Sequence, residues 1–268
     1  MAAERPPNMP SALNPAEIFE RAAEEGKRRL DYSLLALLAT GFIAGFTIIF
    51  GSAAQALIHS AALPHFDEFA SVLGALGFAV GVVFLIVGRA ELFSENFFDP
   101  IATAFEGKER HVFRRLLRLW VLTFALNIVG GTLLILALSV DGALPAGARE
   151  SLMSPASEIA ERAPWATFAR SVVGGALVAL LSFLVIAAQS TGARAMMAYA
   201  VGVMLALGPF EHVVVSMLHL LFGLFIGADL AVQHIARVGA ISLAGNLIGG
   251  IGLVTLSHAA QALGEEGG

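Results

Sequence analysis

The chain has 268 residues, of which 57% are hydrophobic and only 14% charged, and its mean hydropathy is +0.79. A soluble domain of this length would carry more polar residues, so the composition predicts an all-α integral membrane protein. A formal net charge of −5 excludes the basic surface that binding to nucleic acid requires. Because there is no cysteine, disulfides, thiolate metal sites and a cysteine nucleophile are excluded as well.

The first 30 residues differ in composition from the rest. Prolines at positions 6, 7, 10 and 15 lead into the charged sequence EIFERAAEEGKRRLD, which has neither the apolar core nor the cleavage site of a signal peptide. We expect residues 1–30 to form a polar cytoplasmic tail that ends in a short amphipathic helix. Residues 31–264 are then the membrane domain, and residues 265–268 a short C-terminal tail.

Long intervals without charge predict six membrane spans. A bilayer core of about 30 Å requires about 20 residues of helix. Five intervals meet this length: 32–66, 69–88, 119–140, 171–193 and 238–264. The remaining span consists of two shorter pieces, 195–210 and 212–228, which together make one long helix interrupted near its middle.

The distribution of Lys and Arg predicts the orientation of these spans. Eleven basic residues fall on one side: Arg5, Arg21, Lys27, Arg28, Arg29, Lys108, Arg110, Arg114, Arg115, Arg118 and Arg194. Four fall on the other side, Arg149, Arg162, Arg170 and Arg237, and Arg89 is assigned to neither side. Since cytoplasmic loops carry the excess of positive charge, both termini are predicted to be cytoplasmic.

Two segments of the chain resemble each other. ALNIVGGTLLILALS, which begins at Ala125, matches LAGNLIGGIGLVTLS, which begins at Leu243, so that Asn127 aligns with Asn246. With three spans in each half, the two halves would enter the membrane from opposite sides, as in the inverted repeats of transport proteins. Close packing of glycine-rich helices is the alternative explanation for the shared Gly-Gly pair.

The interruption in the fifth span is the sequence LGPFEHVVV. Pro209 fits the first turn of an outgoing helix, so we expect a second half-helix to open near Glu211 and His212, with its free N–H groups directed toward an anion. His212 is either a proton-exchanging group on a pathway or a buried structural histidine. Glu211 is expected to be structural, as a cap for the opposing loop, and His219 to serve in packing.

A second interruption, GRAELFSENFFDP from Gly88 to Pro100, follows the second span. Irregular backbone at membrane depth is tolerated only where protein or a water-filled cavity satisfies it, so two broken spans suggest a pathway. In this stretch Leu92 and Phe93 are expected to form an apolar collar. Hydrogen-bonding groups for the loop would come from Glu91, Ser94, Glu95 and Asn96. The alternative is a plain cytoplasmic loop.

Three motifs together resemble those of the formate/nitrite transporter family. GRAELFSEN is similar to the loop in the broken second helix of that family, GPFEH to its broken fifth helix, and GNLIGG to its sixth helix, and the similarity extends over residues 34–257. The resemblance implies a homopentamer in the bacterial inner membrane, with an aquaporin-like protomer of six helices. It also implies a channel or transporter for formate or nitrite, linked to protons, with no cofactor and no enzymatic activity.

The resemblance also implies roles for individual residues. By position they are the central histidine His212, the apolar constriction residue Phe78, the loop constriction Leu92 and Phe93, the loop hydroxyl Ser94 and the sixth-helix asparagine Asn246. Departures from the commoner pattern are Leu205 in place of a second constriction aromatic, Glu95 and Asn96 in place of small hydroxyl residues, and Ala179 in place of an asparagine. Arg162 or Arg170 could replace the lysine expected near the outer mouth.

In the resembling family, an anion is thought to be drawn inward, protonated at or near the central histidine, and passed through the collars as the neutral acid. An ordinary histidine pKa of about 6.5 suits this conversion. One rival is an intramembrane metallohydrolase, but His212 and His219 lie about 10 Å apart along a helix axis, too far to share a zinc ion. The other rival is a non-conducting membrane scaffold.

Overall fold

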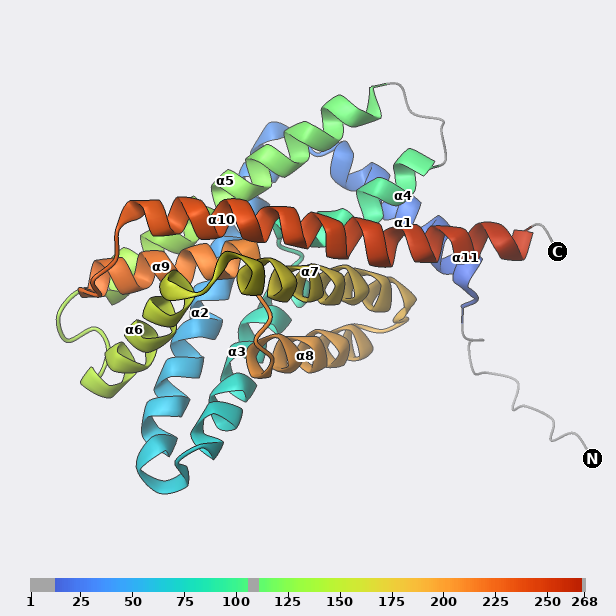
Figure 1. Ribbon diagram of the computed structural model, residues 1–268. Helices are drawn as coiled ribbons and strands as arrows, with labels where there is room; N and C mark the ends of the chain where they lie inside the picture. Colours follow the sequence, from blue (N-terminus) through green and yellow to red (C-terminus); the bar gives the residue numbers. More distant parts are fainter. Residues whose placement is uncertain (1–12, 106–110, 267–268) are drawn as a thin grey trace, which may run out of the picture.

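The computed structural model describes residues 13–105 and 111–266, and every regular element within these ranges is helical (Figure 1). Within this part of the chain, five segments are long and apolar enough to cross a membrane: α2 (Leu34–Phe66), α3 (Phe69–Val87), α5 (Val112–Leu138), α7 (Pro164–Ala187) and the continuous run of α10 (Val232–Leu247), the π-helix η2 (Ile248–Thr255) and α11 (Leu256–Glu266). The fifth predicted span is two shorter apolar helices, α8 (Thr191–Leu207) and α9 (Val213–Ile226). The predicted all-α bundle is thus confirmed.

The second span is broken as well. After α3, residues 88–92 are irregular, and the chain continues as the 3₁₀ helix η1 (Phe93–Phe97) and the short helix α4 (Asp99–Phe105). Every residue from Ala90 to Pro100 is buried. The alternative of a plain cytoplasmic loop is therefore wrong, because such a loop would lie in water.

Some boundaries differ from the prediction. α5 begins at Val112 rather than at residue 119, because its basic first turns continue the helix beyond the apolar interval. Between α5 and α7 the structure has a helix that the sequence analysis did not anticipate, α6 (Ala146–Glu161), which packs against α2 and α9. Arg5, Lys108 and Arg110, and the chain ends 1–12 and 267–268, lie outside the described residues.

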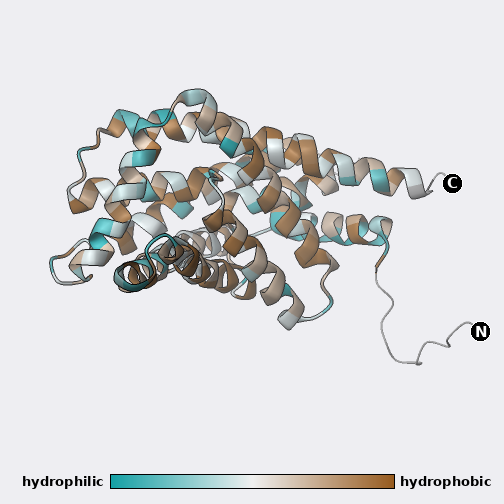
Figure 2. Cartoon of the chain, turned by 60° about the horizontal axis from the view of Figure 1, so that its bottom comes forward, coloured by the Kyte–Doolittle hydropathy of each residue, from teal (hydrophilic) through white to brown (hydrophobic). Residues whose placement is uncertain are grey.

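The outer surface of the bundle is apolar. Hydrophobic residues run along most of the long helices (Figure 2), and large apolar side chains such as Leu35, Phe84 and Val121 are more than half exposed. Water would oppose exposure of so many apolar side chains, so this surface must face lipid or other copies of the chain.

Asn127 on α5 holds the first break in place. Its Oδ1 accepts the Phe93 N–H at 2.9 Å, and its Nδ2 donates to the carbonyls of Glu91 at 3.0 Å and Gly41 at 2.8 Å. All three hydrogen bonds are buried, and Asn127 itself has no exposed surface. One amide thus satisfies backbone groups that the interruption of the second span leaves without helical partners.

Asn246 on α10 does the same at the second break. Its Oδ1 accepts the Val213 N–H at 2.8 Å, and its Nδ2 donates to the carbonyls of Glu211 at 2.8 Å and Ser171 at 2.7 Å. In both halves the amide bonds a glutamate carbonyl, the N–H two residues later and one carbonyl of the neighbouring spanning helix. This matching set of contacts confirms the predicted inverted repeat.

The two asparagines can reach the breaks only because the neighbouring helices approach closely. A Cβ atom added to Gly45 on α2 would lie 1.8 Å from the carbonyl oxygen of Asn127, and one added to Gly175 on α7 would lie 2.3 Å from that of Asn246. No Cβ atom fits at such distances. Glycine at these two positions is therefore a steric requirement of the asparagine clamps, that is, of Asn127 and Asn246 with their hydrogen bonds to the two breaks.

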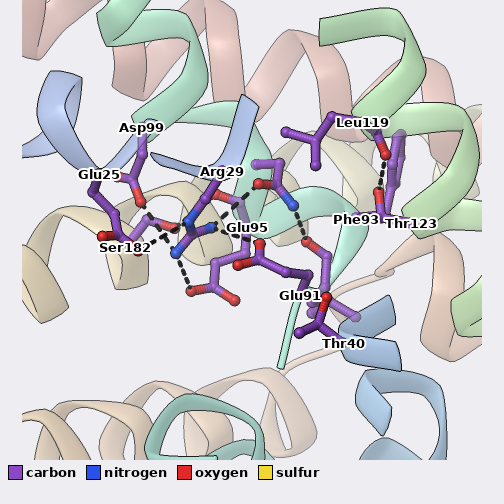
Figure 3. Close-up of polar contacts among 12 residues, drawn as sticks. Glu25, Arg29, Thr40, Glu91, Phe93, Glu95, Asp99, Leu119, Thr123 and Ser182 are labelled. Atoms are coloured by element: carbon purple, nitrogen blue, oxygen red, sulfur yellow. Dashed lines mark hydrogen bonds and ion pairs between the residues drawn. The ribbon is translucent and has the colours of Figure 1, made fainter. Parts of the chain in front are cut away.

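The helix α1 (Pro15–Leu30), which precedes the first span, is fastened to the first break through Arg29. Asn14 starts α1 with a capping box, and the helix packs against α4 and α11. The guanidinium of Arg29 lies 3.1–3.3 Å from carboxylate oxygens of Glu91, Glu95 and Asp99 (Figure 3). Burial by itself would lower the pKa of Arg29, but attraction to these three carboxylates raises it well above its ordinary value, so the residue stays charged.

The role of the asparagine clamps predicts that removal of the Asn246 side-chain amide will strongly lower the stability of the protein. Asn246→Ala removes the partner of the Val213 N–H and of the Glu211 carbonyl, two buried groups at the break, and each such group costs about 1–3 kcal/mol. We expect a clear drop in the melting temperature of the purified protein in detergent. Ser242→Ala, one turn earlier on α10, removes a buried hydroxyl that has no hydrogen-bond partner and should change little. Similar shifts in the two variants would contradict the clamp.

A second comparison tests the role of Arg29. Arg29→Met leaves Glu91, Glu95 and Asp99 buried without their cation, and loss of one partner from such a set costs about 3–5 kcal/mol. The variant should melt earlier and expose α1 to limited proteolysis. The matched control is Arg28→Met, because that side chain is 42% exposed and its ion pair is with Glu25 of the same helix, which should contribute about 0–1 kcal/mol. Equal stability of the two variants would show that Arg29 does not fasten α1.

Candidate functional site

A polar vestibule of ≈ 500 Å³ lies on the α6 side of the bundle, between α2, α3, α6 and the break between α8 and α9. Its polar lining includes Arg162, Arg170, Glu211, His212, Ser216 and His219. With His59 and Glu158, which also line it, two arginines, three histidines and two glutamates face one chamber. The vestibule is large enough for a small hydrated ion, and its inner end is formed at the fifth-span break.

His212 lies at this inner end and is only 3% exposed. It is the N-cap residue of α9, and its Nδ1 accepts the Val215 N–H at 3.4 Å. Its Nε2 is in close hydrogen-bond contact with the Ser94 hydroxyl of the other break. With Nδ1 as acceptor, the neutral ring carries its proton on Nε2 and donates to Ser94.

The N–H groups of the second half-helix are not free, contrary to the expectation. The Val213 N–H is bonded to Asn246 and the Val215 N–H to His212, while the Glu211 N–H donates to the carbonyl of Arg170 at 3.2 Å. The half-helix begins at Val213, after both candidate residues. An anion in the vestibule would therefore meet side chains rather than these three N–H groups.

The Glu211 carboxylate does not cap the opposing loop, in contrast to the expectation. Its two carboxylate oxygens contact Arg162 and the hydroxyl of Ser216. Arg162 also pairs with Glu158 at 2.7 Å, and Arg170 lies 3.6 Å from the same carboxylate. The hydrogen bond from Arg162 lowers the pKa of Glu158, which is exposed and lies outside the predicted spans. The arginines of the vestibule are thus both paired.

A second, much smaller cavity of ≈ 20 Å³ continues from the inner end of the vestibule and has room for about one water molecule. Phe78, Leu205, His212 and Val215 line both cavities and separate them. Leu92 of the first break lines the small cavity but not the vestibule. Apart from His212 and Glu95, all residues that line the small cavity are apolar: Ile48, Phe78, Val82, Leu85, Leu92, Val178, Leu181, Leu205 and Val215.

Phe93 does not line either cavity, in contrast to the expected collar of Leu92 and Phe93. Its ring packs edge-to-face against Phe97, Phe124 and Trp120, with centroid distances of 5.1, 5.2 and 6.3 Å. Successive residues at the start of η1 point to different sides, and the sequence motif does not say which one faces the cavity. Phe93 belongs to the packing between η1 and α5.

The remaining predicted site residues either support the backbone of the breaks or lie next to His212 and the small cavity. Asn246 supports the backbone behind His212, and Asn96 bonds the carbonyl of Leu92 at 2.9 Å and Arg29 at 3.3 Å. Glu91 accepts the Tyr32 hydroxyl at 3.1 Å and pairs with Arg29. These three side chains hold the breaks. Ser94 contacts His212, and Glu95 both pairs with Arg29 and lines the small cavity.

Sequence reasoning missed two residues. Arg29 looks like any other basic residue at the end of an amphipathic helix, and nothing in its neighbourhood signals that it is buried. His219 was expected only to pack, yet it lines the vestibule and its Nε2 lies 3.1 Å from the Ser52 hydroxyl. Its spacing of two helical turns from His212 was a usable signal. Among residues 13–105 and 111–266, no group of three or more His, Cys, Asp or Glu side chains is arranged to hold a metal ion.

Comparison with solved structures gives the same fold. An ion channel of the FNT family superposes with a TM-score of 0.78 at 16% identity, covering 91% of this chain and 98% of that one. A pentameric formate channel with formate bound superposes with a TM-score of 0.69 at 19% identity, covering 90% of this chain and 99% of the channel.

Sequence comparison identifies relatives in two bacteria. The chain is 24% identical over 249 residues to inner membrane protein YfdC of Escherichia coli (strain K12), covering 91% of this chain and 77% of YfdC. It is also 24% identical over 249 residues to transporter YrhG of Bacillus subtilis (strain 168), covering 91% of each. The model of the formate/nitrite transporter family matches residues 16–260. The chain belongs to the formate/nitrite transporter family.

Proposed function

We propose that the protein is a channel for small monovalent anions of weak acids, of the formate and nitrite class, and that a proton is exchanged at His212 during passage. The observation that carries the proposal is the position of His212, between a polar vestibule and a small apolar cavity. The similarity to a channel solved with formate bound supports the substrate class.

The change of polarity at His212 supplies the physical reason. A bare anion loses its hydration in the small cavity and finds no N–H donor among the apolar side chains there, whereas its neutral conjugate acid carries little charge to desolvate. A histidine that first takes up a proton from the vestibule side becomes imidazolium, can transfer that proton to the anion, and then returns to its neutral form. The contact between His212 and Ser94 gives the proton a hydrogen-bonded place at the boundary.

Arg162 and Arg170 would hold the anion before it reaches His212. Both guanidinium groups face the vestibule, and Glu158 and Glu211 offset their charge. The balance prevents a tightly bound anion from blocking the vestibule, because a unit charge near an unpaired arginine in a chamber of low dielectric would be strongly held. Weak, local attraction suits a site that must release its ion.

Assembly and orientation complete the proposal. The pentameric state of the similar formate channel and the exposed apolar flanks of this chain support a homopentamer with one pathway in each protomer. The excess of Lys and Arg on the α1 side supports cytoplasmic termini, so that the vestibule faces outward. A relative named as an inner membrane protein supports the same location here.

His212→Asn tests the proposed function. Asparagine keeps hydrogen-bonding capacity but cannot titrate, so the variant should assemble and lose formate-linked proton uptake together with its pH dependence. The measurement follows formate uptake and internal pH in proteoliposomes between about pH 5 and 8. A well-assembled variant with wild-type proton coupling would refute the role of His212. If the assembled wild-type protein carries neither formate nor nitrite, the result would favour the scaffold without transport.

The boundary of the small cavity leads to a paired prediction. Leu92→Ala should enlarge the cavity and raise the leak of small anions several-fold, because Leu92 lines it. Phe93→Ala should instead lower stability by about 3–5 kcal/mol through lost aromatic packing, with no matching rise in leak. Leak is measured as an anion current across the proteoliposome membrane. A larger leak in Phe93→Ala than in Leu92→Ala would reverse the assignment of the two residues.

A further inference from the structure

His219 lines the same vestibule as His212 and is carried by the same helix, α9. The two histidines are seven residues apart, which places His219 about 10 Å farther along the helix axis, away from the fifth-span break. Ser216 lies between them in the sequence and lines the vestibule as well. One side of α9 thus carries polar groups from the vestibule to the break.

The hydrogen bonds of His219 leave one of its ring nitrogens open. Its Nε2 lies 3.1 Å from the hydroxyl oxygen of Ser52 on α2, and that hydroxyl donates its own proton to the carbonyl of Ile48 at 3.4 Å. The Ser52 oxygen therefore accepts the Nε2–H of His219, and Nδ1 carries the lone pair. Within the described part of the chain Nδ1 has no hydrogen-bond partner, and it is not closed off from solvent. His219 thus presents a basic nitrogen that can take up a proton.

His212 has no such open nitrogen. Its Nδ1 accepts the Val215 N–H at 3.4 Å, and its Nε2 contacts the Ser94 hydroxyl. A proton that arrives from the vestibule must displace one of these bonds before His212 becomes imidazolium. A neighbouring histidine with an unoccupied basic nitrogen can take up the proton first and pass it on.

Among the described residues, no carboxylate of the vestibule is free to hold a protonated His219 in place. The two glutamates of the lining, Glu158 and Glu211, are paired with arginines. The helices α5 and α10, which also pack against α9 and are described in full, contribute none of the lining residues. A proton on His219 is therefore not trapped in an ion pair and can move on. The titratable and charged side chains that share the vestibule with His219 are His59, Glu158, Arg162, Arg170, Glu211 and His212.

We propose that His219 is a proton-relay residue, which takes up a proton from the vestibule and passes it to His212. This inference rests on the proposed function and names the group that supplies its proton. The proton adds to Nδ1 of neutral His219 and gives an imidazolium. It then crosses to His212 through water molecules, and His219 returns to its neutral form. A polar vestibule of ≈ 500 Å³ has room for several water molecules, at roughly 30 Å³ each.

His219→Gln tests the relay. Glutamine keeps a hydrogen bond to Ser52 but cannot titrate. We expect the initial rate of formate uptake in proteoliposomes to fall several-fold at about pH 8, where protons in solution are scarce, and to stay near that of the wild type at about pH 5, where protons reach His212 directly. Imidazole at equal concentration on both sides of the membrane should restore the rate at the higher pH, because it can enter the vestibule and carry the proton instead.

Two variants are matched controls. His59→Gln removes another vestibule histidine that is bonded to a serine, Ser151, at 2.9 Å, but His59 lies about 10 Å beyond Ser52 along α2. Ser52→Ala removes the hydrogen bond between α2 and α9 but leaves His219 able to titrate. We expect neither control to combine a loss at the higher pH with rescue by imidazole. If His219→Gln does not assemble, His219→Met takes its place and is judged by the same two measurements.

The outcomes separate the relay from the proposed function. An unchanged rate at the higher pH, an equal loss at both pH values, or a loss that imidazole does not restore would overturn the relay, as would an equal loss in Ser52→Ala. If His212→Asn abolishes proton coupling and His219→Gln has no effect, the relay alone is refuted. Absence of both formate and nitrite uptake in the assembled wild-type protein would refute the proposed function, and the relay with it.

Discussion

A helix interrupted inside a membrane exposes backbone groups where no water can bond them, and each interruption must be repaired by protein. In this chain the repair is made by two side-chain amides, Asn127 and Asn246, and each uses its one acceptor and both donors on backbone groups. The amide is one of the few groups that can do this. The positions of both breaks, and of every side chain carried by them, depend on these six hydrogen bonds.

The clamps also reveal which residues of the two halves are equivalent. Since each asparagine bonds a glutamate carbonyl and the N–H two residues later, the residue between them occupies the same place in both halves. That residue is Leu92 in one half and His212 in the other, and both line the small cavity. The repeat therefore gives the two breaks the same backbone arrangement. Their chemistry at the small cavity differs because one half has Leu92 where the other has His212.

Charge is arranged differently at the two ends of this frame. On the α6 side, Arg162 and Arg170 meet Glu158 and Glu211, so positive and negative groups are matched in a polar vestibule. On the α1 side, Arg29 is shared by several buried carboxylates. Buried charges of this kind contribute little net stability, and removal of the shared cation is costly because the carboxylates would remain unpaired. The α1 helix is thus joined to the first break by buried charged contacts.

The sequence by itself determined the spans, the two breaks and the duplication that aligns Asn127 with Asn246. The length and lack of charge of a segment decide whether it can cross a bilayer, and a proline shows where a helix is interrupted, so these features can be recognised locally. It did not determine which neighbour faces the cavity. Leu92 and Phe93 are equally apolar, and only the packing of Phe93 against Phe97, Trp120 and Phe124 decides between them. Nor could it show that Arg29 is buried, since its carboxylate partners lie more than sixty positions away along the chain and meet it only in the folded bundle.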